Sequence, residues 1–348
     1  MIARRLIPML TLLGWLVSTW PVAAQQGSLE ASLWQTYKSR FLDASGRIVD
    51  NGNGGISHSE GQGYGMLLAF FANSQSDFEQ IWSFTKTELM VRDDGLAAWK
   101  WDMATEPHVS DLNNASDGDL LIAYALAMAG AAWDRQDYLA SAAALARAIL
   151  NNVVVERGGR VLLLPAAEGF DVGERPDGPV INPSYWIFEA LPVMAVLAPS
   201  DQWSRLGEEG IALLEMMKFG PRNLPAEWVS LARQPKPAEG FGAEFGYNAI
   251  RIPLYLLRAE TGHFALVRRL QEAMTIDGAP AIINLANGEA KERLDDPGYD
   301  FVNHILACVS DGKSLPSAAR ELTSDLYYPA TLHLLGYAYV VEKHPSCL

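Results

Sequence analysis

The chain has 348 residues, 49% of them apolar and 20% charged, with a formal net charge of −14. A chain this long and this apolar can bury a large core, whereas the acidic charge argues against nucleic acid or an anionic membrane as a partner. A neutral or cationic substrate is easier to accommodate. The six histidines and two cysteines form no closely spaced ligand motif, so we expect neither a metal site nor a cofactor.

Residues 1–24 have the features of a secretory signal peptide. A short basic start with two arginines precedes an apolar stretch, residues 6–20, and the small residues of V-A-A-Q follow at once. The apolar stretch is short for a membrane span, so this order favours export with cleavage after Ala24 over an uncleaved anchor. Loss of the two arginines takes the net charge from −14 to −16. We expect residues 25–348 to form one domain that is secreted or periplasmic, without stable membrane insertion.

Apolar residues recur at helical spacing along nearly the whole remaining chain, first at Leu29, Leu33, Tyr37 and Phe41. Strand-like alternation is scarce, and R-V-L-L-L-P at 160–165 is the best of few candidates. In S-D-F-E at 76–79 and P-S-D-Q-W at 199–203, a small polar residue can accept from the first backbone N–H groups of a helix. The sequence therefore predicts an all-α protein.

Some of these helices are far more apolar than others. Residues 117–133 and 327–339 are typical of helices buried on most sides, whereas residues 137–150 are typical of a helix with one wet face. Apolar and amphipathic segments alternate along the chain. About a dozen helices in this order, without a short repeat, fit a closed (α/α)6 barrel of six helical hairpins, with an open helical array as the alternative.

The two cysteines, Cys308 and Cys347, can pair in an oxidising compartment and hold the C-terminal tail. Disulfide geometry cannot be read from spacing, so the sequence leaves this pairing open.

Two acidic motifs have both a structural and a functional interpretation. In S-H-S-E-G-Q-G-Y-G-M, residues 57–66, Ser57 and Glu60 have the spacing of a capping box, in which the acid only satisfies backbone donors of its own helix. Ser116 and Asp119 have the same spacing, which leaves Asp117 without a structural task.

Polar or aromatic residues mark the beginnings of several apolar segments about one hairpin apart, at Glu60, Asp117, 182–186, 246–251 and 327–328. If each begins an inner helix of one barrel, these starts gather at one open end and line a cleft. Two carboxyl groups in a cleft walled by aromatic rings are what glycosidic bond cleavage requires, and aromatic faces stack on sugar rings. The aromatic candidates are Trp99, Trp101, Tyr185 and Trp186.

These segments resemble glycoside hydrolase family 8, the secreted bacterial endoglucanases that include those associated with cellulose synthesis. The resemblance is carried by S-E-G-Q-G-Y-G-M at 59–66, A-S-D-G-D-L-L-I-A-Y-A-L-A-M-A-G-A-A-W at 115–133 and G-Y-N-A-I-R-I-P-L-Y at 246–255. It implies an (α/α)6 barrel that hydrolyses internal bonds of a polysaccharide, β-1,4-glucan, with inversion and without a metal. It also implies a functional link to a cellulose synthase complex.

The resemblance implies roles for single residues. Glu60 matches the general acid. Asp117 matches the aspartate of the A-[ST]-D motif, as nucleophile or as the residue that holds the distorted sugar. Tyr247 and Arg251 match positions beside the attacking water and the same sugar. Sugar-binding positions are matched by Trp99, Tyr185 and the pair Tyr327 and Tyr328.

One position departs from the family pattern. Asn248 stands where many members carry an aspartate as general base, and an amide cannot take a proton from water at neutral pH. Glu244 is the nearest candidate for the base, with a surface turn residue as its other interpretation. Two further functions stay open: a related hydrolase acting on chitosan, xylan or mixed-linkage glucan, and a non-catalytic glucan-binding protein.

Overall fold

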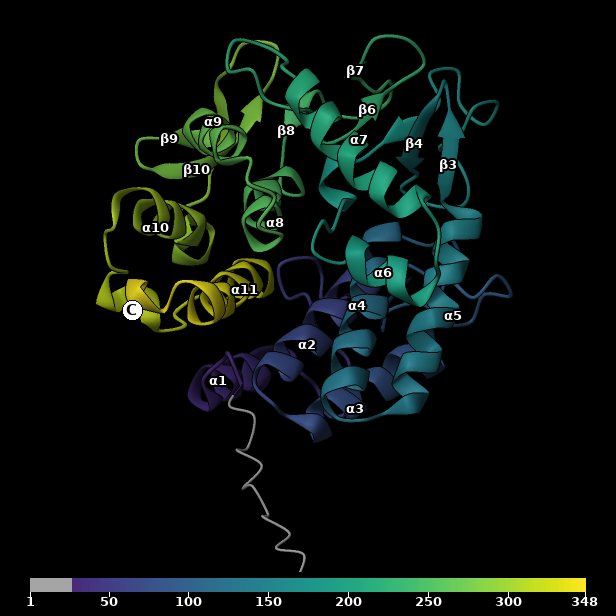
Figure 1. The fold of residues 1–348 in the computed structure, drawn as a ribbon, viewed down its shortest axis with the longest axis vertical. Coiled ribbons are helices and arrows are strands. Elements are labelled where there is room, and N and C mark those ends of the chain that lie inside the picture. The colour runs from purple at the N-terminus through teal and green to yellow at the C-terminus, as the bar shows by residue number, and fades with distance from the viewer. Residues whose placement is uncertain (1–26) are drawn as a thin grey trace, which may run out of the picture.

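The computed structural model describes residues 27–348, so the expected cleavage after Ala24 lies outside the described residues. Helices dominate this range and form two layers (Figure 1). Four helices are buried on nearly all sides: α2 (Ser59–Phe71), α4 (Ser116–Ala132), α8 (Ile252–Arg258) and α11 (Tyr327–Lys343). Six helices bury one face and form the outer layer: α1 (Ala31–Phe41), α3 (Gln75–Phe84), α5 (Gln136–Asn152), α7 (Gln202–Met216), α9 (Phe264–Met274) and α10 (Pro297–Asp311).

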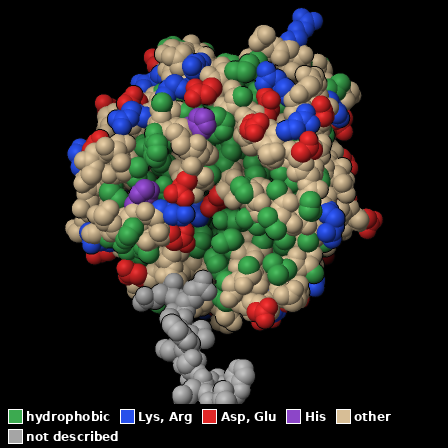
Figure 2. All heavy atoms as spheres, in the orientation of Figure 1, with side chains coloured by type: hydrophobic (Ala, Val, Ile, Leu, Met, Phe, Trp, Pro, Cys, Tyr) green, Lys and Arg blue, Asp and Glu red, His purple; other side chains and the backbone are tan. Residues whose placement is uncertain are grey.

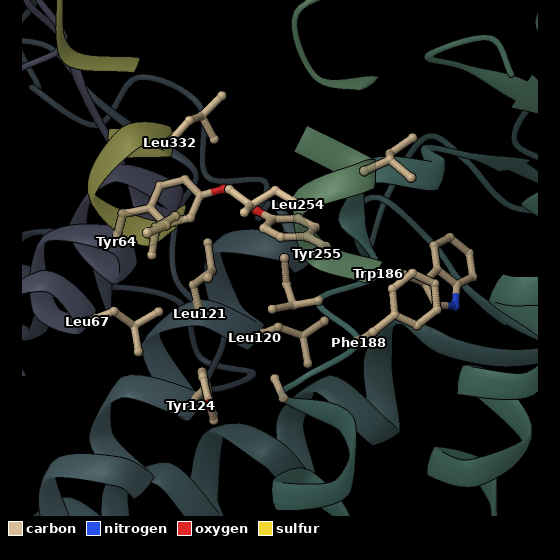
Figure 3. Packing of buried hydrophobic residues seen from close by; sticks show 14 of the residues in the cluster. Tyr64, Leu67, Leu120, Leu121, Tyr124, Trp186, Phe188, Leu254, Tyr255 and Leu332 are labelled. Atoms are coloured by element: carbon tan, nitrogen blue, oxygen red, sulfur yellow. The ribbon is translucent and has the colours of Figure 1, made fainter. Parts of the chain in front are cut away.

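The inner layer closes on itself. Helix α2 packs against α4 and α11, and α11 packs against α8, while α1 lies beside α11, so the first and last helices of the described chain meet (Figure 1). Below the open end, Tyr64 of α2 and Tyr255 of α8 point their hydroxyls toward each other and form a hydrogen bond (Figure 3). The 3-10 turn Pro183–Tyr185 contacts both α4 and the turn Ala249–Arg251 that leads into α8, so the inner helices form a closed ring and not an open array.

Helices α2 and α4 approach closely because glycines stand at their contact. A Cβ on Gly118 would lie 2.1 Å from Ser59 Oγ, and a Cβ on Gly63 would lie 2.5 Å from Leu121 Cβ. A side chain at either position would force the two helices apart. The first turns of the two helices, which carry the acidic residues singled out above, therefore lie in contact.

The prediction that an inner helix begins at 182–186 is wrong, because the helix begins later in the chain. Residues Pro183–Tyr185 form one 3-10 turn, closed by Asn182 Oδ1, which accepts from Ser184 N at 3.1 Å. Helix α6 begins only at Leu191 and ends at Leu197 (Leu191–Leu197). Pro192 explains the late start, since proline inside a longer helix would remove a backbone hydrogen bond. Hydrophobic side chains gather over α6 on the surface, where Val196 is 79% exposed (Figure 2).

The strand expected at 160–165 is confirmed as β4 (Arg160–Leu163), which pairs antiparallel with β3 (Val154–Arg157). The other strands were missed because most have two residues, too few to show alternation. They are β1 (Ser57–His58), β2 (Lys100–Trp101), β5 (Val180–Ile181), β6 (Val229–Ser230), β7 (Lys236–Pro237), β8 (Glu244–Phe245), β9 (Thr275–Ile276), β10 (Ala279–Asn284) and β11 (Ala290–Arg293).

The short strand pairs fix loops beside the helix starts. Strand β1 pairs with β2 so that Ser57 lies opposite Trp101, and Ser59 N donates to Trp99 O at 3.0 Å. Strand β8 pairs with β10, with Glu244 opposite Asn284. These contacts anchor the segments that enter α2 and precede α8.

The two expected helix starts differ in outcome. Helix α3 begins at Gln75, so the segment 76–79 lies inside the helix and does not cap it. Before α7, Ser200 Oγ accepts from Gln202 N at 3.2 Å, which is the interaction expected at 199–203. Among the helices of residues 27–348, none combines the length and apolar character that a membrane span needs.

Cys308 and Cys347 form a disulfide, with their Cα atoms 5.8 Å apart. The bond joins α10 to the last residues of the chain, where Leu315 N also donates to Cys347 O at 2.7 Å. The pairing that the sequence left open is therefore made, and it holds the C-terminal tail.

Replacing Cys347 by serine should lower the free energy of unfolding by about 2–4 kcal/mol, because the disulfide closes a loop across 39 positions in the unfolded chain. Chemical denaturation of the oxidised wild type and the variant measures the difference. Reduced wild type should unfold like the variant. If the oxidised proteins were equally stable, the bond would contribute nothing to the fold.

Candidate active site

A cleft of about 590 Å³ opens at the helix-start end of the barrel. The sequence-predicted residues that line it come from six separated segments: Glu60, Trp99, Asp117, Tyr185, Tyr247, Asn248, Tyr327 and Tyr328. Its lining also contains Asp50, His58 and Tyr299. The structure thus brings most of the predicted site residues together, although their roles stay predictions at this point.

Arg251 lies at the floor of the cleft and has no exposed surface. It closes the 3-10 turn Ala249–Arg251 that leads into α8. Its Nη1 donates to Glu60 Oε2, its Nη2 donates to Asp117 Oδ2 at 2.5 Å, and its Nε donates to Ser184 O at 3.3 Å. One buried guanidinium therefore holds two carboxylates from different helices in one place.

The capping interpretation of Glu60 is wrong. Helix α2 begins at Ser59, and its first turn is capped by His58, whose Nδ1 accepts from Gly61 N at 2.9 Å. Ser57 Oγ instead donates to the carbonyl of Ile48. The Glu60 carboxylate does not cap the helix, and it points instead to Arg251 in the cleft.

The capping interpretation of Asp119 is also wrong. Helix α4 has no side-chain cap, and Asp119 accepts from Ala97 N and from Asn114 Nδ2, both at 2.8 Å. Asp119 therefore fixes the loops before α4. Asp117 faces the cleft, 1% exposed, and accepts from Gly118 N at 2.8 Å in addition to Arg251.

The two cleft carboxyls that share Arg251 titrate as a pair. Burial, together with the Glu60 charge, raises the pKa of Asp117 to about 7, although Arg251 opposes this. Burial also favours the neutral form of Glu60, but Arg251 and His58 outweigh it and hold the Glu60 pKa below its usual range. The raised pKa of the pair therefore belongs to Asp117 and not to Glu60. Below about pH 7 the pair holds one proton next to one guanidinium.

His58 was missed as a cleft residue, because a lone histidine is more often a packed or surface residue. Its Nε2 lies 3.2 Å from Asp50 Oδ2, and its ring packs edge-on against Tyr327 with centroids 5.6 Å apart. The only sequence signal was its place two positions before Glu60. Asp50 had no signal at all, since it follows an ordinary turn.

The aromatic candidates divide into two groups. Trp99 lines the cleft, and its indole N–H donates to Asp111 Oδ2 at 2.8 Å, while Tyr185 lines the cleft with its ring 5.7 Å from the Arg251 guanidinium carbon. Trp101 and Trp186 are 7% and 1% exposed, and their indole N–H groups donate to Glu88 and to the carbonyl of Leu206. The latter two belong to the core.

The segment with the departure from the family pattern forms one wall of the cleft. Tyr247 is 45% exposed, and its carbonyl accepts from Tyr328 Oη at 2.9 Å. Asn248 N donates to Glu227 Oε1 at 2.6 Å. Tyr327 lies opposite, with a buried hydroxyl that has no hydrogen-bond partner in residues 27–348.

Two predicted site residues do not line the cleft, Arg251, which is buried beneath its floor, and Glu244. Glu244 lies in β8, and its carboxylate forms an ion pair with Lys291 of β11. Nearer to Asn248 is Glu227, which the sequence did not single out because it stands 21 positions away. Within the described range, no group of three or more acidic, histidine or cysteine side chains could hold a metal ion.

Comparison with known proteins agrees with this geometry. A sequence model of the glycosyl hydrolases family 8 matches residues 7–340. A probable endoglucanase of Novacetimonas hansenii is 35% identical over 322 residues, covering 90% of this chain and 91% of that protein.

Solved structures show the same fold. Endoglucanase Cel10 of Klebsiella pneumoniae superposes with a TM-score of 0.81 at 34% identity, over 90% of this chain and all (100%) of that one. The endo-β-1,4-glucanase CMCax of Acetobacter xylinum gives 0.79 at 35% identity, over 88% and 96% of the two chains. The expected (α/α)6 barrel is thereby confirmed.

An aromatic-walled cleft with paired carboxyls at its floor, in this fold, defines a glycosidase. The chain belongs to the glycosyl hydrolases family 8.

Replacing Asp117 by asparagine should lower turnover on β-1,4-glucan by at least ~10²-fold, since a carboxylate beside the sugar binds the transition state more tightly than the ground state. Steady-state kinetics on a soluble glucan measure the loss.

Asp119→Asn is the matched control, two positions along the same helix. It should cost roughly 0.5–2 kcal/mol of stability, because one of two accepted hydrogen bonds is weakened, and it should leave turnover nearly unchanged. Equal kinetic damage at both positions would show that the motif matters only as a folded unit.

Proposed function

We propose that the protein is an exported endo-β-1,4-glucanase that hydrolyses internal bonds with inversion. The observation that carries this proposal is Arg251, which holds Glu60 and Asp117 together at the floor of an aromatic-walled cleft. Relatives with the names endoglucanase and endo-β-1,4-glucanase, at about one third identity, support the reaction and the substrate.

Glu60 acts as the general acid in this proposal. It is the more exposed of the two paired carboxyls, with 15% of its side chain exposed against 2% for Asp117. Below about pH 7 the pair holds one proton, and both carboxyls lie on the same guanidinium, so that proton can pass to Glu60. Glu60 can therefore reach the leaving oxygen, and the proton is delivered there as the bond breaks.

Asp117 and Arg251 hold the sugar at the cleavage point. Asp117 is almost completely buried, and its carboxylate accepts hydrogen bonds from Arg251 and from Gly118 N. Its remaining capacity to accept hydrogen bonds is directed into the cleft. The rings of Trp99 and Tyr185 offer faces for stacking on neighbouring sugars. A rigid floor of this kind favours substrate distortion, which lowers the barrier to hydrolysis.

Chitosan, xylan and mixed-linkage glucan are the competing substrates. The cleft contains three carboxyls, Asp50, Glu60 and Asp117, against one buried guanidinium, and this balance suits an ammonium-bearing chain such as chitosan. Release of reducing ends from carboxymethylcellulose, chitosan, xylan and lichenan separates these cases. No release from any of them would leave a glucan-binding protein.

Export and a link to cellulose synthesis complete the proposal. The basic start, apolar stretch and V-A-A-Q of residues 1–25 support a cleaved signal and a secreted or periplasmic location. The disulfide supports an oxidising compartment. A functional link to a cellulose synthase complex is supported by relatives that come from cellulose-producing bacteria.

Glu60→Gln should abolish hydrolysis, with a loss of roughly 10²–10⁴-fold, because glutamine can still accept from Arg251 but cannot donate a proton to the leaving oxygen. Turnover, thermal unfolding and glucan binding are measured together. Folding and binding should stay near wild type. A variant with normal turnover would remove Glu60 from the chemistry.

Turnover should fall about tenfold per pH unit above about pH 7, because the Glu60 and Asp117 pair gives up its shared proton there. The active form is the protonated one, so the loss lies on the alkaline side. A pH profile of kcat/KM tests this, with circular dichroism as a control for unfolding. A plateau extending beyond pH 9 would contradict it.

A further inference from the structure

An inverting glycosidase needs a second group that removes a proton from the attacking water. Asn248 lies in the cleft wall but has no basic atom at neutral pH. The Glu244 carboxylate is already engaged by Lys291 in an ion pair. The proton acceptor must be found elsewhere.

Glu227 lies directly behind the Asn248 backbone. Its Oε1 accepts from Asn248 N at 2.6 Å, and a Cβ on Gly246 would lie only 2.5 Å from that oxygen, so the glycine makes room for the carboxylate. Glu227 N donates to Glu244 O at 3.0 Å, which places the two acids side by side. The side chain of Glu227 is partly exposed and keeps contact with solvent.

The carboxylate is held rigidly. The next residue, Trp228, has its ring stacked between Phe170 and Phe241, at centroid distances of 5.5 Å and 4.5 Å. Tyr185 also packs edge-on against Trp228, with centroids 6.2 Å apart. A wall of aromatic rings therefore fixes Glu227 relative to a cleft residue, as a positioned proton acceptor requires.

Glu227 differs from the other acids of the region in its charge environment. Within residues 27–348 it forms no ion pair, whereas Glu60, Asp117 and Glu244 each have a cationic partner. Burial, and after it the Glu244 charge, raises the pKa of Glu227. Burial raises the pKa of the cleft residue Tyr185, and the charges of Asp117, Glu60 and Glu227 raise it further.

We propose that Glu227 is the general base of this enzyme and that Asn248 orients the attacking water. The water oxygen bonds to the anomeric carbon while one water proton passes to the free Glu227 oxygen. The bond to the leaving oxygen breaks, and Glu60 protonates that oxygen. Glu227 ends protonated and Glu60 ionised, and exchange with solvent restores both. This inference rests on the proposed hydrolytic function.

The test compares Glu227→Gln with the matched control Glu244→Gln in the otherwise intact protein. Glutamine at 227 can still accept from Asn248 N, so the wall keeps its anchor while the base is lost. Turnover on carboxymethylcellulose should fall at least ~10²-fold for Glu227→Gln and less than ~3-fold for Glu244→Gln. Circular dichroism and thermal unfolding of both variants report the fold.

Sodium azide separates a base from a structural anchor. An added azide ion needs no deprotonation, so it should restore bond cleavage in Glu227→Gln and give a glycosyl azide of inverted configuration. Asn248→Asp in the same background should also restore turnover, because it supplies a carboxylate beside the water. Loss of turnover that neither change rescues would overturn the proposal, as would a Glu227→Gln variant that keeps normal turnover.

The wild type and Glu60→Gln serve as references for the reaction itself. If the wild type cleaves glucan and Glu60→Gln does not, the hydrolytic function stands whatever happens at Glu227. If the wild type cleaves none of the polysaccharides, both the function and the base assignment fail together. An active wild type with a fully active Glu227→Gln variant defeats the base assignment alone.

Discussion

The structure depends on one interaction, the buried guanidinium of Arg251 between Glu60 and Asp117. Burying a charged arginine is costly unless carboxylates and hydrogen bonds replace its water. Two carboxylates satisfy the guanidinium but leave an excess negative charge, which is removed when the pair retains a proton. The residue that stabilises the cleft floor thus also makes an acid available near neutral pH.

The barrel is built to keep these three groups together. Glycine at the α2–α4 contact brings Glu60 and Asp117 within reach of one guanidinium. Helix α8 has a buried arginine at each end, since Arg258 pairs with Glu189 at 2.6 Å and donates to the carbonyl of Leu335 at 2.7 Å. Helix α8 is therefore held at both ends, and Arg251 cannot shift along the barrel axis without breaking the second pair.

The sequence predicts the layers and the gathering of helix starts well, because burial controls hydrophobic pattern and all inner helices share one direction. It fails where contacts are set in three dimensions. Ser57 and Glu60 have capping spacing, yet His58 caps the helix. Ser57 lies in β1, and its hydroxyl donates to the carbonyl of Ile48 instead. The helix expected at 182 begins only at Leu191, with Pro192 in its first turn. Trp101 lies inside the two-residue strand β2 and packs in the core, whereas Trp99 lies just before that strand and lines the cleft.

The roles of the acids follow from which of them have cationic partners. These ion pairs cannot be read from the sequence, because the partners are far apart along the chain. Arg251 is 191 and 134 positions from its two carboxylates, and Lys291 is 47 positions from Glu244. A search along the chain from Asn248 finds Glu244 first because it is near in sequence, although Lys291 engages its carboxylate in an ion pair. Glu227 lies beside Glu244 through one backbone hydrogen bond and forms no ion pair in the described chain, so only the folded wall distinguishes the two acids.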